Sequence, residues 1–386
     1  MRNGYKVYDA DTHIMPSAET LEQFLDPDLR ELLPDREQNK VPIRIGLAGE
    51  ERTPPYRHMY RFGGGGGGWG SGKPRILGEA APREVERHFQ QFMGTRFPTE
   101  GGVDYSAETR LQDMDEEGIG VHMMVPSGAN GHKNPDVEMG FIRANHRYLH
   151  DFCSVSPQRL KSLIVVSSRC IGESLQEIRR WAREPWAVGI QPYFPLDYPL
   201  DHPDMNPIWA AAAEEGLTIV HHSFASGYPG YRDLWDNPFL GRTASHPWAA
   251  MRALAAFFGS GIMDRFPSLR YAILESGFGW LPFWARRMDD QAVYMGTVAE
   301  GLKQKPSEYM TSGRFFASIV LHEGPEMIKM VSELLGDHLL MFGSDYPHAE
   351  SRFPESAHKV IGWEGLDNPL LQKLLWDNPV RCFGKP

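Results

Sequence analysis

Residues able to bind a metal ion or move a proton follow several short apolar runs of this chain. They are Asp11 and His13, His221 and His222, Glu275, and Asp345 within Gly-Ser-Asp-Tyr-Pro. Imidazole nitrogens and carboxylate oxygens together suit Zn²⁺, Mn²⁺ or Fe²⁺, whereas a thiolate site would need cysteines. A carboxyl group can also deliver a proton where burial raises its pKa. These residues lie far apart in the chain, so only the fold can gather them.

Each residue also has a simpler interpretation. Asp11 could be a turn or capping residue, and His13 could be a histidine packed in the core. Neighbouring residues on a strand point to opposite faces, so only one of His221 and His222 can face such a site. Glu275 could cap a helix that starts near Trp280. A shared site is favoured because such residues recur at four different strand ends.

The elements that must position these residues alternate strictly. We predict strands at Lys6–Asp11, Ile119–Val125, Leu163–Val166, Val188–Pro192, Thr218–His222, Arg270–Leu274, Phe315–Val320 and Leu339–Phe342. Between them, apolar spacing of three and four residues predicts helices at Val137–Phe152, Leu175–Ala182, Asn206–Glu215, Trp248–Phe258, Trp280–Asp289 and Glu326–Leu335, with a shorter one ending at Gly118. Eight such units favour an α/β fold closed into a distorted (β/α)8 TIM barrel, whose chemistry lies at the carboxyl ends of the strands. An open doubly wound sheet is the alternative, but no Gly-x-Gly-x-x-Gly follows a strand.

Residues 17–105 have little periodicity, and we interpret them as a loop-rich insertion after the first strand of a single domain spanning 1–386. The glycines Gly64–Gly68 precede Trp69 there. The stretch lacks the Gly-Lys-Ser/Thr ending of a phosphate loop. It is either a surface loop or a flap that brings Trp69 over a ligand.

Composition excludes several classes of protein. The net charge of −10 and the lack of a dense basic run argue against nucleic acid as a partner. No apolar stretch is long enough to span a membrane, and the first residues do not form a signal peptide. The three cysteines lie far apart with no Cys-x-x-Cys spacing, and an odd number in a long chain is typical of reduced, buried thiols. We therefore expect a cytoplasmic enzyme with a small-molecule substrate.

Four segments resemble the amidohydrolase superfamily, in the branch that includes aminocarboxymuconate-semialdehyde decarboxylase and the resorcylate and carboxyvanillate decarboxylases. They are Tyr8–His13, Leu217–His222, Arg270–Pro282 and Leu339–His348, and the last carries the most specific motif, Gly-Ser-Asp-Tyr-Pro. The resemblance implies one divalent ion held by Asp11, His13, His222 and Asp345, with an open position for water or substrate. It also implies a homo-oligomer.

Two positions depart from the pattern of that branch. Asp11 replaces the first histidine or glutamate, and a carboxylate there favours a harder ion such as Mn²⁺ over Zn²⁺, with Fe²⁺ also possible. Glu275 replaces the histidine that the branch uses for proton transfer or substrate contact. The fold is therefore better defined than the reaction.

The same residues support two reactions. In a non-oxidative decarboxylation of an aromatic or unsaturated acid, Asp345 or Glu275 would deliver a proton to carbon as CO₂ leaves. In a hydrolysis of an amide or lactone, or a hydration, the ion would activate water and Asp345 would take its proton. Phe278, Trp280 and Tyr346 could form aromatic walls or simply pack. We predict decarboxylation, with Glu275 and Asp345 as the catalytic residues.

Overall fold

A computed structural model of the chain describes residues 1–33, 35–42, 44–45, 50–51, 58–60, 62, 95, 106–127, 131–194, 200–222, 238–296 and 301–386. Its main sheet has eight strands: β1 (Tyr8–Ile14), β6 (Val121–Pro126), β7 (Leu160–Ser167), β8 (Ala187–Tyr193), β9 (Thr218–His222), β10 (Arg270–Leu274), β11 (Phe315–Ser318) and β12 (Leu340–Met341). Each strand pairs in parallel with the next along the chain. All eight predicted strands are confirmed, although β1 starts and ends later than expected.

The sheet closes on itself between β1 and the segment after β12. Ala10 N donates to Phe342 O at 2.9 Å, Asp345 N donates to Asp11 O at 2.9 Å, and a parallel bridge joins Thr12 to Tyr346. The fold is therefore a (β/α)8 barrel, as predicted. Its closing seam is thin, because β12 has only two residues.

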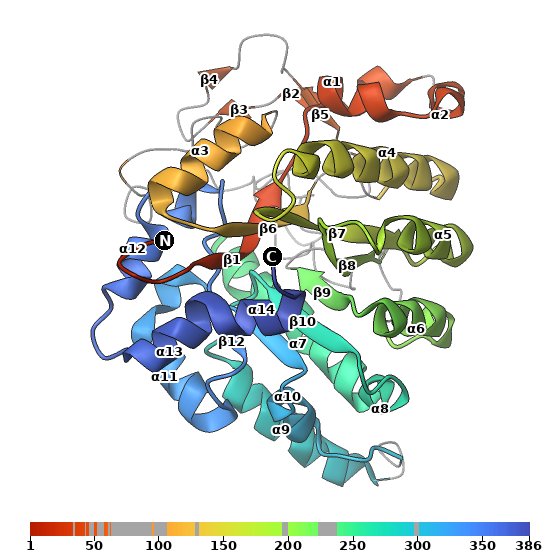
Figure 1. Cartoon of the computed structure of the whole chain (residues 1–386). Helices are drawn as coiled ribbons and strands as arrows, with labels where there is room; N and C mark the ends of the chain where they lie inside the picture. Colours follow the sequence, from red (N-terminus) through yellow and green to blue (C-terminus); the bar gives the residue numbers. More distant parts are fainter. Residues whose placement is uncertain are drawn as a thin grey trace, which may run out of the picture.

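Helices cover the outside of the barrel (Figure 1). The helices that follow or precede strands are α3 (Ala107–Glu117), α4 (Pro135–Ser154), α5 (Ile171–Trp181), α6 (Asn206–Glu215), α7 (Pro238–Gly259), α9 (Leu281–Met295) and α11 (Gly324–Leu335). Shorter helices are α8 (Ile262–Arg265), α10 (Pro306–Thr311), α12 (Ser356–Ile361), α13 (Asn368–Gln372) and α14 (Asn378–Phe383). Local signals explain several ends: Asn134 caps α4 by accepting from Asp136 N, and Gly118 ends α3 with φ of 77°. Helix α7 begins ahead of the predicted Trp248, because the helix continues through Pro247.

The barrel interior is a packed core. One buried cluster contains residues from all eight strands together with Cys382 and Phe383 of α14. Helix α14 lies at the amino ends of the strands, where Cys382 O accepts from Thr218 Oγ1 and from Arg270 Nε. Figure 1 shows α14 across this end of the barrel. The carboxyl ends of the strands are therefore left for a site.

Part of the predicted insertion has regular structure. It contains α1 (Ala18–Leu21), α2 (Pro27–Leu32), and two antiparallel pairs formed by β2 (Lys40–Pro42) with β5 (His58–Tyr60) and by β3 (Arg44–Ile45) with β4 (Glu50–Glu51). Tyr60 and Phe62 pack against Phe141 of α4, with ring centroids 4.8 and 4.7 Å apart. Gly64–Gly68 and Trp69 lie outside the described residues. The flap and the single-domain boundary stay predictions.

The described part of the chain contains no helix long and apolar enough to cross a bilayer. All three cysteines are free.

Candidate metal centre

The structure brings the predicted site residues together at the carboxyl ends of four strands. Asp11 and His13 lie on β1, His222 ends β9, Glu275 follows β10 and Asp345 follows β12. Ligand atoms of Asp11, His13 and His222 all lie within 4.8 Å of one another. The fourth predicted ligand, Asp345, contacts this group at His13, whose Nε2 is 2.9 Å from Asp345 Oδ1.

Glu275 contacts the same imidazoles. Its Oε2 lies 3.0 Å from His222 Nε2 and 3.3 Å from His13 Nε2. Its backbone N–H donates to Asp11 Oδ2 at 2.9 Å and to Ser318 Oγ at 3.0 Å, and the Ser318 hydroxyl donates to Asp11 Oδ2 at 2.7 Å. Ser318, at the end of β11, thus links the carboxylate of Asp11 to the backbone of Glu275.

Glu275 does not cap the following helix. The carboxylate that accepts the backbone N–H groups before α9 belongs to Glu323, whose Oε2 is 3.2 Å from Phe278 N and 2.7 Å from Gly279 N. Both oxygens of Glu323 lie close to the position that a Cβ would take on Gly277 or Gly279. Glu275 is therefore left to face the imidazoles.

The two predicted catalytic carboxylates share an unusual backbone conformation. Glu275 has φ of 47° and Asp345 has φ of 66°, in the left-handed region that non-glycine residues seldom adopt. Such strain costs about 1–3 kcal/mol for each residue and persists where the surrounding structure holds it in place. Of the four non-glycine residues with positive φ in the described part of the chain, these two carry carboxylates of the site.

The polar atoms at this point fit a bound cation. Asp11 Oδ1, His13 Nε2 and Asp345 Oδ1 are buried and make no hydrogen bond of good geometry with the described residues. Burying such polar atoms is unfavourable unless they are hydrogen-bonded, paired with an opposite charge or coordinated to a metal. Two imidazoles and two carboxylates are ligands that Mn²⁺, Fe²⁺ and Zn²⁺ accept. The donor set therefore suits a divalent ion.

The charges of the site act strongly on one another. Burial alone would raise the pKa of Glu275, but the facing His222 and His13 hold that pKa well below its usual value. Burial and the negative charge of Glu275 raise the pKa of Asp345 well above its usual value. Burial lowers the pKa of His222, but Glu275 and Asp11 outweigh it and raise that pKa well above the usual range. The pKa values of the two carboxyl groups are thus shifted in opposite directions.

The sequence reasoning did not single out His348. Its ligand nitrogen lies within 4.8 Å of a ring nitrogen of His13 and a carboxylate oxygen of Asp345, and its ring centroid is 4.6 Å from that of His13. A turn in which His348 N donates to Asp345 O at 2.9 Å brings both residues to the same place. The available signal was its position three residues after Asp345 in the same motif.

His221 is buried but belongs to neither ligand group. Burial and the neighbouring His222 lower its pKa to about 3, so its imidazole is neutral. The alternation along β9 therefore selects His222 for the site, as expected.

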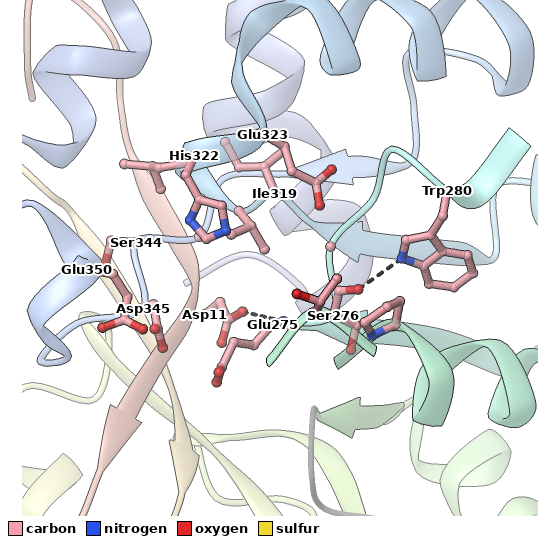
Figure 2. Close-up of a pocket in the computed structure, with 16 residues that line it drawn as sticks. Asp11, Glu275, Ser276, Trp280, Ile319, His322, Glu323, Ser344, Asp345 and Glu350 are labelled. Carbon is pink, nitrogen blue, oxygen red and sulfur yellow. Dashed lines mark hydrogen bonds between the residues drawn. The ribbon is translucent and has the colours of Figure 1, made fainter. Parts of the chain in front are cut away.

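A cavity of about 360 Å³ opens beside the centre. Figure 2 shows the carboxylates of Asp11, Glu275 and Asp345 at one side of it, and His322 and Trp280 farther along its wall. The Trp280 indole donates to Ser276 O at 2.9 Å, which fixes the ring. Of the predicted aromatic walls only Trp280 lines this cavity, because Phe278 and Tyr346 are buried in the core.

Comparison with known proteins places this geometry in a family. The model of the amidohydrolase family matches residues 9–385. The chain belongs to the amidohydrolase family. This match includes every element that carries the site, from β1 to the turn after β12.

Several relatives of this amidohydrolase are decarboxylases by name. A 2-amino-3-carboxymuconate-6-semialdehyde decarboxylase of Dictyostelium discoideum is 22% identical over 254 residues, which are 63% of this chain and 67% of the relative. A 5-carboxyvanillate decarboxylase of Novosphingobium aromaticivorans complexed with manganese has a TM-score of 0.69 at 19% identity, covering 99% of this chain and 97% of that one. A 2,6-dihydroxybenzoate decarboxylase of Rhizobium has a TM-score of 0.63 at 17% identity, covering 73% and 88%. At these identities the structural matches establish the fold.

Proposed function

We propose that this amidohydrolase is a metal-dependent decarboxylase of an aromatic or unsaturated carboxylic acid. The observation that carries the proposal is the convergence of two imidazoles with carboxylates at the mouth of the barrel, beside a cavity large enough for a small ring. The choice of reaction is supported by the relatives, whose named reactions are decarboxylations.

Asp11, His13 and His222 would hold one divalent ion, with Asp345 as the adjoining fourth ligand. The ligand set and the manganese in a related structure favour Mn²⁺, with Zn²⁺ and Fe²⁺ as the other candidates. His348 is a further candidate, because it reaches His13 and Asp345 from the mouth of the barrel. A divalent ion at this point supplies Lewis-acid polarisation of the substrate's carboxylate and any neighbouring oxygen.

The side chains of the site would hold the substrate and transfer one proton. Trp280 and the wall near Ile319 would hold the apolar part of the substrate against the centre. Asp345 or Glu275 would carry the proton and deliver it to the carbon that bears the carboxylate. The bond from that carbon to the carboxylate carbon then breaks, its electron pair restores the ring or double bond, and CO₂ leaves. The proton donor then takes a new proton from water.

Glu275 lies against His13 and His222, so both carboxyl groups are at the centre. Because the donor must be protonated to act, turnover should fall as pH rises through the pKa of the donor.

Hydrolysis or hydration is not favoured, although the same centre could activate water. The test is to load the protein with Mn²⁺ and incubate it separately with hydroxybenzoates, unsaturated carboxylic acids, and aryl amides or lactones. Release of CO₂ without turnover of the amides and lactones is the expected result. Hydrolysis of an amide or lactone without any decarboxylation would reject the proposal.

The ligand assignment has its own test, which is metal analysis of Asp11→Ala and His222→Ala. Both variants should lose bound ion, and full retention in both would refute the assignment. A cytoplasmic homo-oligomer remains our prediction from the sequence.

A further inference from the structure

One arginine of the described chain is fully buried beside the closing seam of the barrel. Arg110, on α3, is only 1% exposed. Its Nη1 donates to His13 O at 2.8 Å, and its Nη2 donates to Thr12 Oγ1 at 3.1 Å. The guanidinium therefore binds two consecutive residues of β1, Thr12 and the predicted metal ligand His13.

The same guanidinium contacts the other side of the seam. It stacks on the ring of Tyr346, with Cζ 4.7 Å from the ring centroid, and Tyr346 directly follows the ligand Asp345. The Tyr346 hydroxyl donates to Asp113 Oδ2 at 2.8 Å, and Asp113 lies one turn after Arg110 on α3. Helix α3 thus holds both edges of the seam through two side chains.

Arg110 Nε contacts a third strand. Arg110 Nε donates to His122 Nδ1 of β6 at 3.2 Å. Burial and the charge of Arg110 keep the pKa of His122 well below its usual value, so the imidazole is neutral and can accept this bond. Planar guanidinium geometry makes these contacts possible at once, which an ammonium group cannot do.

We propose that Arg110, with Tyr346 and Asp113, is a positioning device that sets the distance between the β1 ligands and Asp345. The backbone seam alone is a weak constraint, because the ladder there consists of a bridge and a few hydrogen bonds next to a two-residue strand. This proposal rests on the metal centre of the proposed function, but it concerns affinity for the ion and not the reaction.

The experiment compares Mn²⁺ dissociation constants by titration calorimetry for the wild type, Arg110→Lys and a matched control, Arg159→Lys. Arg159 also donates to backbone carbonyls next to β6, those of Gly120 at 3.2 Å and Ile119 at 3.0 Å, but at the amino end of the strand. Loss of support behind metal ligands typically weakens affinity about 10–100-fold. We expect that loss for Arg110→Lys and an unchanged affinity for Arg159→Lys, with circular dichroism confirming that both are folded.

Equal Mn²⁺ affinity in folded Arg110→Lys and wild type would overturn the proposal. If Arg110→Lys does not fold, Tyr346→Phe decides, because it keeps the ring under the guanidinium and removes only the bond to Asp113. A measurable weakening supports the device, and wild-type affinity in Tyr346→Phe overturns it. Failure of the wild type itself to bind any divalent ion would instead reject the proposed function.

Discussion

Replacing Ser318 with alanine removes a single hydroxyl and tests whether that hydroxyl orients the predicted ligand Asp11. The Ser318 hydroxyl donates to Asp11 Oδ2 at 2.7 Å and accepts from Glu275 N at 3.0 Å, and the side chain is buried. A hydrogen bond to a charged group contributes about 1.5–3 kcal/mol. Glu275 N keeps its second bond to Asp11 Oδ2, so the backbone donor is not left unpaired.

Two quantities should change in Ser318→Ala. The free energy of unfolding of the metal-free protein should fall by about 1.5–3 kcal/mol. Asp11 also loses the group that orients it, so affinity for Mn²⁺ should fall about 10–100-fold. At a fixed excess of Mn²⁺ that loss removes about 1.4–2.8 kcal/mol of metal-dependent stabilisation.

The assay is urea unfolding with Mn²⁺ and with a chelator, together with calorimetric titration. Ser276→Ala is the matched control, because its buried hydroxyl donates to Leu274 O at 2.9 Å and not to Asp11. That variant should lose about 0.5–1.5 kcal/mol of stability and keep its metal affinity. Equal Mn²⁺ affinities for Ser318→Ala and wild type would refute the argument that Ser318 orients a ligand.

Three further predictions concern the surroundings of the centre. Glu275→Gln should keep bound Mn²⁺ but lower kcat about 10²-fold or more, because one of the two carboxyl groups that can deliver the proton is removed; a near-normal kcat would leave Glu275 a structural residue. Gly277→Ala should lower the melting temperature, because Gly277 has φ of 69° and a Cβ would clash with Glu323 Oε1; an unchanged melting temperature would contradict this clash. Burial, opposed by hydrogen bonds from Ser356 and reinforced by nearby carboxylates, raises the pKa of Glu117 from its ordinary value of 4.5 to about 8, so the wild type should lose stability as pH rises between those values. Over that interval the free energy of unfolding of Glu117→Gln should fall less than that of the wild type, by about 1.4 kcal/mol for each unit of the pKa shift. Urea unfolding at several pH values measures this difference. Parallel stability curves for the two proteins would show that Glu117 does not titrate in that range.

Local patterns were enough to predict the strands and most of the helices. A parallel strand buried on both faces reads as an apolar run, and each run here was followed by apolar positions at helical spacing. The patterns were least informative where local chemistry and tertiary packing disagree. The predicted helix began at Trp248, whereas α7 begins at Pro238 and continues through Pro247. Within 17–105, Tyr60 packs on Phe141 of α4, a contact that local periodicity does not reveal.

The sequence by itself determined which residue types end the strands, and with them the fold class and the candidates Asp11, His13, His222, Glu275 and Asp345. Only the tertiary structure decided how they meet. The left-handed backbone of Glu275 and Asp345, the turn that brings His348 to His13, and the buried Arg110 behind the seam all depend on contacts between segments remote in the chain. Sequence periodicity reports which face of an element is apolar, whereas distances among side chains from different strands arise only when the barrel closes.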